Sequence, residues 1–311
     1  MATFIGRRYI APMKSPVHSV SRATLLIVVS ALSFGSISVL TVLVTRAGVP
    51  LVTAMAWRYV IGALLLFGFV GNRKLAAIPR RRIFQLFVIG GFGQALITYL
   101  SLHALEFIPV GPLAFLFYTY PAWVALLAAV RRTERLTLVR VIALSLALFG
   151  VTVMVGTSAT DKLNPEGVLL ALGSALLYSA YLPSLEHFQR GIPALVSTFL
   201  LIAGAAVSFV LGAIVTSRLH LPVGLAVWSY IFLLALVSTV IAFSTLIKGL
   251  SVLGPVRTAI VATVEPFFTA MLGFAVLENE LTIATLAGGV LIAAAVLLIQ
   301  WSTTRLPATA A

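Results

Sequence analysis

A short pattern occurs twice in this chain with its charge reversed. Residues 131–140, RRTERLTLVR, align with residues 276–285, VLENELTIAT, and the alignment runs without gaps from about residue 83 onward. The first copy carries four arginines, whereas the second carries none and has Glu278 and Glu280. Because Lys and Arg residues stay on the cytoplasmic side of a membrane protein, the two copies are expected on opposite sides of a bilayer. This placement predicts an inverted repeat.

The composition excludes an ordinary soluble protein. The chain is 61% hydrophobic and 9% charged, with a mean hydropathy of +1.13, whereas soluble domains carry about 25% charged residues. Cysteine is absent, which excludes a disulfide framework, a thiol nucleophile and a Cys-based metal site. The net charge of +13 is gathered between apolar runs, and this distribution favours orientation in a membrane over nucleic-acid binding.

The chain contains ten hydrophobic segments, each close to the ~20 residues that a transmembrane helix needs. They are 22–45, 50–71, 82–105, 109–130, 136–157, 166–187, 192–215, 225–248, 252–276 and 281–301. They predict an all-α membrane protein built from two inverted five-helix repeats. The expected parts are a basic cytoplasmic tail (1–21), a first repeat (22–157), a linker (158–165), a second repeat (166–301) and a C-terminal cytoplasmic tail (302–311).

The basic residues also predict an orientation. With the N-terminus inside, only Arg46, Lys162 and Arg218 fall outside, Arg58 falls within the second span, and every other Lys and Arg falls inside. This bias predicts that both termini are cytoplasmic and that the protein is a multi-pass protein of the inner (plasma) membrane. Arg58 is expected to snorkel to the outer headgroups, with pairing to a carboxylate as the alternative.

Two prolines occupy equivalent repeat positions in the middle of predicted spans. Pro121 and Pro266 each remove a backbone hydrogen bond and crowd the carbonyl group four residues earlier, on Phe117 and Ala262. Freed carbonyls are tolerated at membrane depth only inside protein or beside a polar cavity. We therefore expect kinks or hinges beside a central cavity, although single prolines are also common in ordinary membrane helices.

Glu265 is the only carboxylate in the middle of a predicted span. A charge at that depth costs several kcal/mol, so such residues usually face a cavity and have a function. Two roles stay open for Glu265. It either contacts a proton or a solute, or it is a structural carboxyl group held beside Pro266.

A polar face is predicted on the third span. Tyr99 and His103 lie four residues apart and hence on one helix face, where they could bind a carboxylate or an amine. Gln94, Thr98 and Ser101 form a neighbouring polar face. The alternative for His103 is an interfacial position near the outer headgroups. In the second repeat, the positions of Tyr99 and His103 are held by Ser244 and Lys248.

Four further tyrosines lie near mid-span, where a buried hydroxyl group needs a partner. They are Tyr118, Tyr120, Tyr178 and Tyr181. The simpler alternative is core packing with one hydrogen bond each. Together with the third span they predict an aromatic-lined solute site made of Tyr99, His103, Tyr118, Tyr120, Tyr178, Tyr181 and Ser244.

The second copy of the repeat resembles a known family. Residues 239–300 contain Lys248-Gly249, Glu265-Pro266, Gly273, Glu278 and Gly288-Gly289, and they resemble the C-terminal half of the EamA domain of the drug/metabolite transporter superfamily. Residues 94–155 resemble the same half-domain, with Tyr120-Pro121 in place of Glu265-Pro266. The resemblance extends from about residue 22 to 301. It implies a ten-helix secondary transporter that exports small metabolites, such as amino acids, or drugs.

The sequence lacks the motifs of enzymes and ATP-driven pumps. It has neither a phosphate-binding loop nor a Gly-x-Ser-x-Gly elbow, and its four histidines lack metal-ligand spacing. We therefore expect no catalytic residues, no metal and no cofactor, with transport either passive or coupled to an ion such as the proton. An intramembrane enzyme and a membrane receptor or scaffold are the alternatives of other classes.

The expected solute follows from the groups in the spans. Aromatic rings and neutral hydroxyls suit hydrophobic or aromatic amino acids or similar amphipathic solutes, whereas sugar phosphates usually need clusters of Arg or Lys. Alternating access around a central cavity would move such a solute. The expected partners are this small molecule and the lipid bilayer, without nucleic acid, and the sequence assigns no oligomeric state.

The inverted repeat predicts opposite labelling of two loops. Glu134→Cys and Asn279→Cys each introduce the only thiol of the chain. In intact membranes, a reagent that cannot cross the bilayer should label the two variants from opposite sides, because the loops carry opposite charge. Labelling of both from the same side would refute the inverted repeat.

Overall fold

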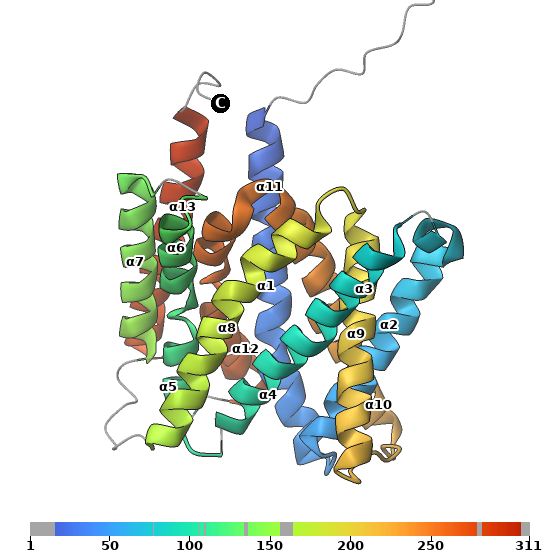
Figure 1. The fold of residues 1–311 in the computed structure, drawn as a ribbon. Coiled ribbons are helices and arrows are strands. Elements are labelled where there is room, and N and C mark those ends of the chain that lie inside the picture. The colour runs from blue at the N-terminus through green and yellow to red at the C-terminus, as the bar shows by residue number, and fades with distance from the viewer. Residues whose placement is uncertain are drawn as a thin grey trace, which may run out of the picture.

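The computed structural model describes residues 16–76, 78–104, 106–108, 110–133, 136–155, 164–278 and 282–305. Within these ranges the chain is helical, with short turns between helices (Figure 1). The first half contains α1 (Pro16–Arg46), α2 (Leu51–Ala76), α3 (Arg80–Val88), η1 (Ile89–Gly93), α4 (Gln94–Ala104), α5 (Val110–Phe117), α6 (Tyr120–Val130) and α7 (Leu138–Val155). The second contains α8 (Pro165–Gln189), α9 (Ala194–Val215), α10 (Leu225–Ala235), η3 (Leu236–Ile241), α11 (Ala242–Ala262), α12 (Glu265–Leu277) and α13 (Ile283–Arg305).

These elements combine into ten spans, which confirms the predicted all-α architecture. The spans formed by α1, α2, α7, α8, α9 and α13 are single helices, and the other four are composite. In the described residues, six helical stretches are long and apolar enough to cross a membrane, and four shorter apolar helices accompany them. The eighth and ninth spans meet inside α11 at Gly254, whose φ of +74° only glycine adopts without strain, followed by Pro255.

The helix ends differ slightly from the predicted spans. The first helix begins at Pro16, inside the segment expected to be a basic cytoplasmic tail, and the last continues to Arg305. Most of the expected N-terminal tail, most of the linker and the end of the C-terminal tail lie outside the described residues, as do positions 134 and 279.

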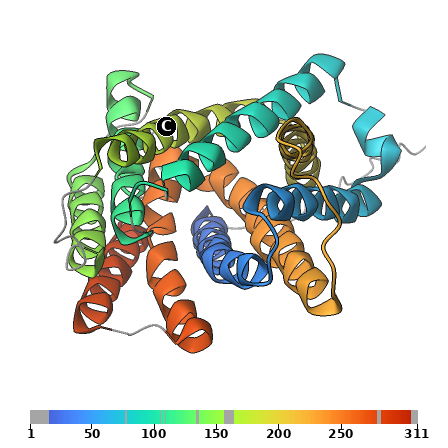
Figure 2. The same ribbon diagram turned by 90° about the horizontal axis from the view of Figure 1, so that it is seen from below.

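The two halves pack in matching ways. Helix α1 of the first half lies along α11 and α12 of the second half. Its repeat equivalent α8, of the second half, lies along α4, α5 and α6 of the first half. The second spans of the two halves, α2 and α9, pack together, and so do the last spans, α7 and α13. Figures 1 and 2 show α7 and α13 on one side of α1, with α2, α9 and α10 on the other. Exchanging the halves therefore reproduces these helix pairings.

The equivalent helices α7 and α13 run in opposite directions. Helix α7 begins at the end of the molecule where α1 begins, whereas α13 begins at the opposite end and finishes at the end where α1 begins (Figure 1). The described first and last helical residues thus lie at one end of the bundle. This arrangement is that of an inverted repeat.

Each half also contains one broken span and one π-helical segment. Helix α5 ends at Phe117 and α6 begins at Tyr120, and in the second half α11 ends at Ala262 and α12 begins at Glu265. The π-helical segments η1 and η3 lie within the third span of their halves. A π-helical segment changes the hydrogen-bond register and is frequent at functional sites. The sequence analysis predicted neither π-helical segment.

Glycines permit a close contact between the third span and α9. A Cβ atom added to Gly204 would lie 2.2 Å from the carbonyl oxygen of Phe87 and 2.7 Å from the amide nitrogen of Gly91. Gly212 on the same helix has no heavy atom within 4 Å of such a position. Small residues of this kind allow helix backbones to approach in membranes.

This difference predicts opposite effects of two alanine substitutions on α9. Gly204→Ala should lower the free energy of unfolding by about 1–3 kcal/mol, the usual cost of overpacking. Gly212→Ala should leave it unchanged or raise it, because alanine favours a helix over glycine by about 1 kcal/mol. The thermal midpoints of the purified variants in detergent test this expectation. Equal midpoints would show that the backbones do not pack this closely.

Candidate solute site

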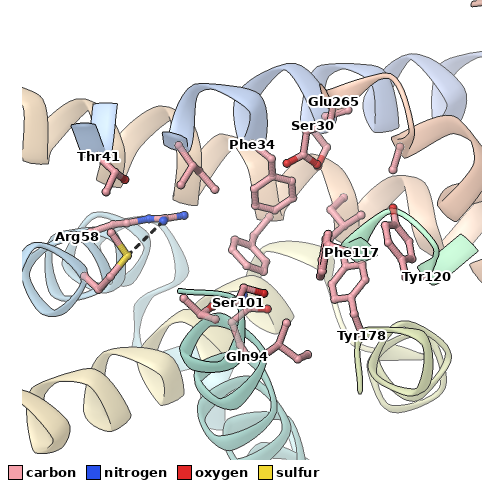
Figure 3. Close-up of a pocket in the computed structure, with 18 of the residues that line it drawn as sticks. Ser30, Phe34, Thr41, Arg58, Gln94, Ser101, Phe117, Tyr120, Tyr178 and Glu265 are labelled. Carbon is pink, nitrogen blue, oxygen red and sulfur yellow. Dashed lines mark hydrogen bonds between the residues drawn. The ribbon is translucent and has the colours of Figure 1, made fainter. Parts of the chain in front are cut away.

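A cavity of about 210 Å³ lies between the two halves of the protein (Figure 3). Its walls come from α1, α2, α4, α5 and α6 of the first half and from α8, α11 and α12 of the second. Because both halves contribute, the cavity lies where inverted-repeat transporters bind their solutes.

The two broken spans meet this cavity. Phe117 and Tyr120 flank the break in the first half, Ala262 and Glu265 flank the equivalent break in the second, and all four line the cavity. Pro121 and Pro266 follow in the first turn of α6 and α12 and are buried. Proline fits a first turn because its missing N–H would have no helical partner there.

Aromatic rings form one wall of the cavity. The rings of Tyr120 and Tyr178 meet edge to face with centroids 4.8 Å apart, and Phe117 contacts them at 5.5 and 5.6 Å. Phe34 and Phe243 form a second edge-to-face pair at 5.0 Å. These separations lie in the favourable range for aromatic pairs of about 4.5–7 Å, so the rings hold one another in place around the empty space.

Glu265 is half-buried and faces the cavity from the first turn of α12. The hydroxyl group of Tyr118 lies near its carboxyl group. The N-terminus of a helix carries a partial positive charge, so the start of α12 provides a favourable position for a carboxylate.

Arg58 lines the same cavity, and the expectation that it snorkels to the headgroups is wrong. Its side chain is 2% exposed. Its Nε donates to Thr239 Oγ1 at 2.6 Å, its Nη2 to the carbonyl oxygen of Ser238 at 2.7 Å, and its Nη1 approaches Met55 Sδ at 3.6 Å. Ser238 and Thr239 belong to the π-helical segment η3. The guanidinium turns inward because this segment offers it acceptors there.

Some polar groups in the cavity have no partner among the described residues. Gln94 donates to Thr98 Oγ1 at 3.2 Å, but the Oε1 atom of Gln94 and the Oγ1 atom of Thr41 accept or donate no hydrogen bond. Both residues line the cavity. Buried polar groups are normally satisfied, so these two atoms lack the partner that such groups usually have.

The structure brings only part of the predicted site together. The cavity is lined by Tyr120, Tyr178 and Glu265. Tyr118 and Tyr181 are buried nearby, with Tyr181 stacked on Tyr178 at 6.0 Å between ring centroids. These residues come from the break between α5 and α6 and from α6, α8 and α12.

Tyr99, His103 and Ser244 lie outside the cavity lining. Tyr99 is 57% exposed and stacks on His103 with ring centroids 5.5 Å apart. His103 Nδ1 lies 3.4 Å from a carboxylate oxygen of Glu106. Ser244 has a buried hydroxyl group without a partner in the described chain.

The rotation of α4 explains why Tyr99 is outside. The neighbouring face of that span, with Gln94, Thr98 and Ser101, points into the cavity instead. These residues share a face at helical spacing, and Tyr99 lies on another. The sequence shows both polar faces but not which of them turns toward the other half.

Arg58 and the Gln94 face are the site residues that the predicted solute site omitted. Their sequence signals were present: an ionisable residue inside a span and polar residues at helical spacing on the third span. Periodicity alone could not rank them above the tyrosines.

Both halves of the sequence match one family. Residues 21–156 and 165–301 each match the EamA-like transporter family. No curated protein matches the sequence. A solved crystal structure aligns with 92% of this chain and 98% of that chain, at a TM-score of 0.77 and 22% identity, which is a likeness of fold. The chain therefore belongs to the EamA-like transporter family and is a multi-pass membrane transporter, not an enzyme.

Proposed function

We propose that this secondary transporter exports hydrophobic or aromatic amino acids, or similar small amphipathic solutes. The observation that carries the proposal is the cavity between the halves, with its aromatic wall and its unpartnered polar atoms. Aromatic side chains would stack on the rings, while the polar end of the solute would meet the hydroxyl, amide and charged groups. The proposed location is the inner membrane, with both termini in the cytoplasm, as the distribution of basic residues favours.

The size of the cavity favours a small solute over a drug. Pockets for drug-sized ligands usually measure about 300–1,000 Å³, whereas this cavity measures about 210 Å³. Its charge disfavours sugar phosphates, since Arg58 is the only Lys or Arg among the described lining residues. Strongly anionic solutes usually need several cationic groups.

The two broken spans support an alternating-access mechanism. Each half contributes one break to the cavity wall, at Phe117–Tyr120 and at Ala262–Glu265. Breaks allow the part of a span on one side of the cavity to move relative to the part on the other. In inverted-repeat transporters, one repeat or bundle rocks against another around a fixed site. Pro121 and Pro266 would act as the hinge points.

Stacking on the aromatic wall predicts how substitutions affect transport. In proteoliposomes, Tyr120→Ala should slow counterflow of radiolabelled phenylalanine roughly 3- to 10-fold, as expected for the loss of one aromatic contact. Tyr120→Phe should change it much less, because the ring remains. Tyr99→Ala is the matched control, since Tyr99 lies outside the cavity. Equal losses in Tyr99→Ala and Tyr120→Ala would argue against this site.

Proton coupling through Glu265 is part of the proposal. The carboxyl group faces the cavity, and no basic side chain neutralises it in an ion pair recorded among the described residues. A carboxyl group in this position could bind a proton in one conformation and release it in the other. The alternative is a structural carboxyl group held beside Pro266.

Coupling predicts that Glu265→Gln loses its response to a pH gradient. Transport by the wild type should accelerate when a gradient is imposed across the vesicle, and transport by the variant should not. Exchange without a gradient should persist at a reduced rate, because the amide still offers a hydrogen-bond acceptor. A folded variant, shown by an unchanged elution profile and thermal midpoint, that keeps the wild-type pH response would make Glu265 structural.

A further inference from the structure

The guanidinium of Arg58 has donors left over that face the cavity. An arginine carries five N–H donors. The Nε atom donates to Thr239, one Nη donates to Ser238, and the other lies near the weak acceptor sulfur of Met55. One N–H on each terminal nitrogen is left for another acceptor. The planar fork of an arginine matches the two oxygens of a carboxylate.

The charge of Arg58 is not balanced by an acidic side chain. Among the described residues, no Asp or Glu side chain forms an ion pair with Arg58. A buried cation without a partner is strongly unfavourable. An anionic group that enters the cavity would supply the missing counter-charge.

The position of the guanidinium is fixed before any solute arrives. Thr239 Oγ1, which accepts from Arg58, itself donates to the carbonyl oxygen of Leu234 at 3.0 Å. The side chain of Ser238 is joined to Ser36 of α1 by a hydroxyl–hydroxyl contact of 2.7 Å. Arg58 also lies over the ring of Tyr59, 5.0 Å from its centroid. Such preorganisation reduces the entropy that binding must lose.

The opposite charge lies across the cavity. Figure 3 shows Arg58 and Glu265 on opposite sides, with Phe34 between them and Phe117, Tyr120 and Tyr178 along the wall next to Glu265. In the described part of the chain, no Lys, Arg or His side chain forms an ion pair with Glu265. One cavity therefore has an unpaired cation at one side, an unpaired carboxyl group at the other, and aromatic rings beside the latter.

We propose that Arg58 is the subsite for the carboxylate of the solute, and that the solute binds in one orientation as a zwitterion. The carboxylate meets the guanidinium, the ammonium group points toward Glu265, and the side chain lies against the aromatic wall. This inference rests on the proposed export of amino acids and narrows it. It selects α-amino acids over amines and carboxylic acids of the same shape, because each of those leaves one charge of the cavity unpaired.

Three probes of similar shape test the subsite in proteoliposomes: L-phenylalanine, phenethylamine, which lacks the carboxylate, and 3-phenylpropionate, which lacks the ammonium group. The wild type should exchange phenylalanine ~10- to 100-fold faster than either, the range expected for the loss of a charged hydrogen bond. Arg58→Gln should slow the exchange of phenylalanine by a similar factor and leave the exchange rate of phenethylamine unchanged. Arg46→Gln, an exposed arginine at the end of α1, should behave as the wild type.

Each of the following results supports or refutes the carboxylate subsite at Arg58. The subsite is refuted if the wild type exchanges phenethylamine as fast as phenylalanine, or if folded Arg58→Gln slows both equally. If Arg58→Gln does not fold, the wild type alone tests the subsite. Its exchange rates for the three probes and the shift of its thermal midpoint with each probe are then measured. The expected result is that only phenylalanine raises the thermal midpoint. A wild type that exchanges none of the probes would overturn the proposed amino-acid export, and the subsite with it.

Discussion

The structure depends on one requirement, that backbone polar groups inside a bilayer find partners within the protein. The breaks in the fourth and ninth spans satisfy it locally. Thr119 donates through its amide and its hydroxyl group to the carbonyl oxygen of Leu116, at 3.3 and 2.7 Å, and Thr263 donates in the same two ways to Ile260, at 3.3 and 2.6 Å. The chain can therefore interrupt a helix beside the cavity without leaving these carbonyls unpaired.

The same requirement explains the position of Arg58. A π-helical segment alters the hydrogen bonding of the eighth span, and the carbonyl group of Ser238 within this segment accepts a hydrogen bond from Arg58. The guanidinium takes this acceptor together with the hydroxyl group of Thr239. A backbone irregularity in one half thus orients a charged side chain of the other. This pairing places the charge at the cavity and not at the lipid headgroups.

Much of the fold could be predicted because it follows from local properties of the chain. Apolar run length predicted the spans, and the reversed charge of residues 131–140 and 276–285 predicted that the halves are inverted. The site could be predicted less well. Tyr120, Tyr178 and Glu265 line the cavity, but Tyr99 and His103 do not. Helical periodicity defines the faces of a span, whereas the rotation of that span depends on the helices around it.

The sequence by itself determined the ten spans, the duplicated halves and the positions of the helix breaks. Hydropathy, charge and proline determine these features because their effects on the chain are local and extend over only a few residues. Only the tertiary structure decided which face of α4 lines the cavity and where the side chain of Arg58 points. Both depend on partners far away in the chain, such as Ser238 and Thr239, and on close backbone contacts such as that of Gly204 with Phe87. No local pattern encodes these contacts, since they exist only once the two halves have packed together.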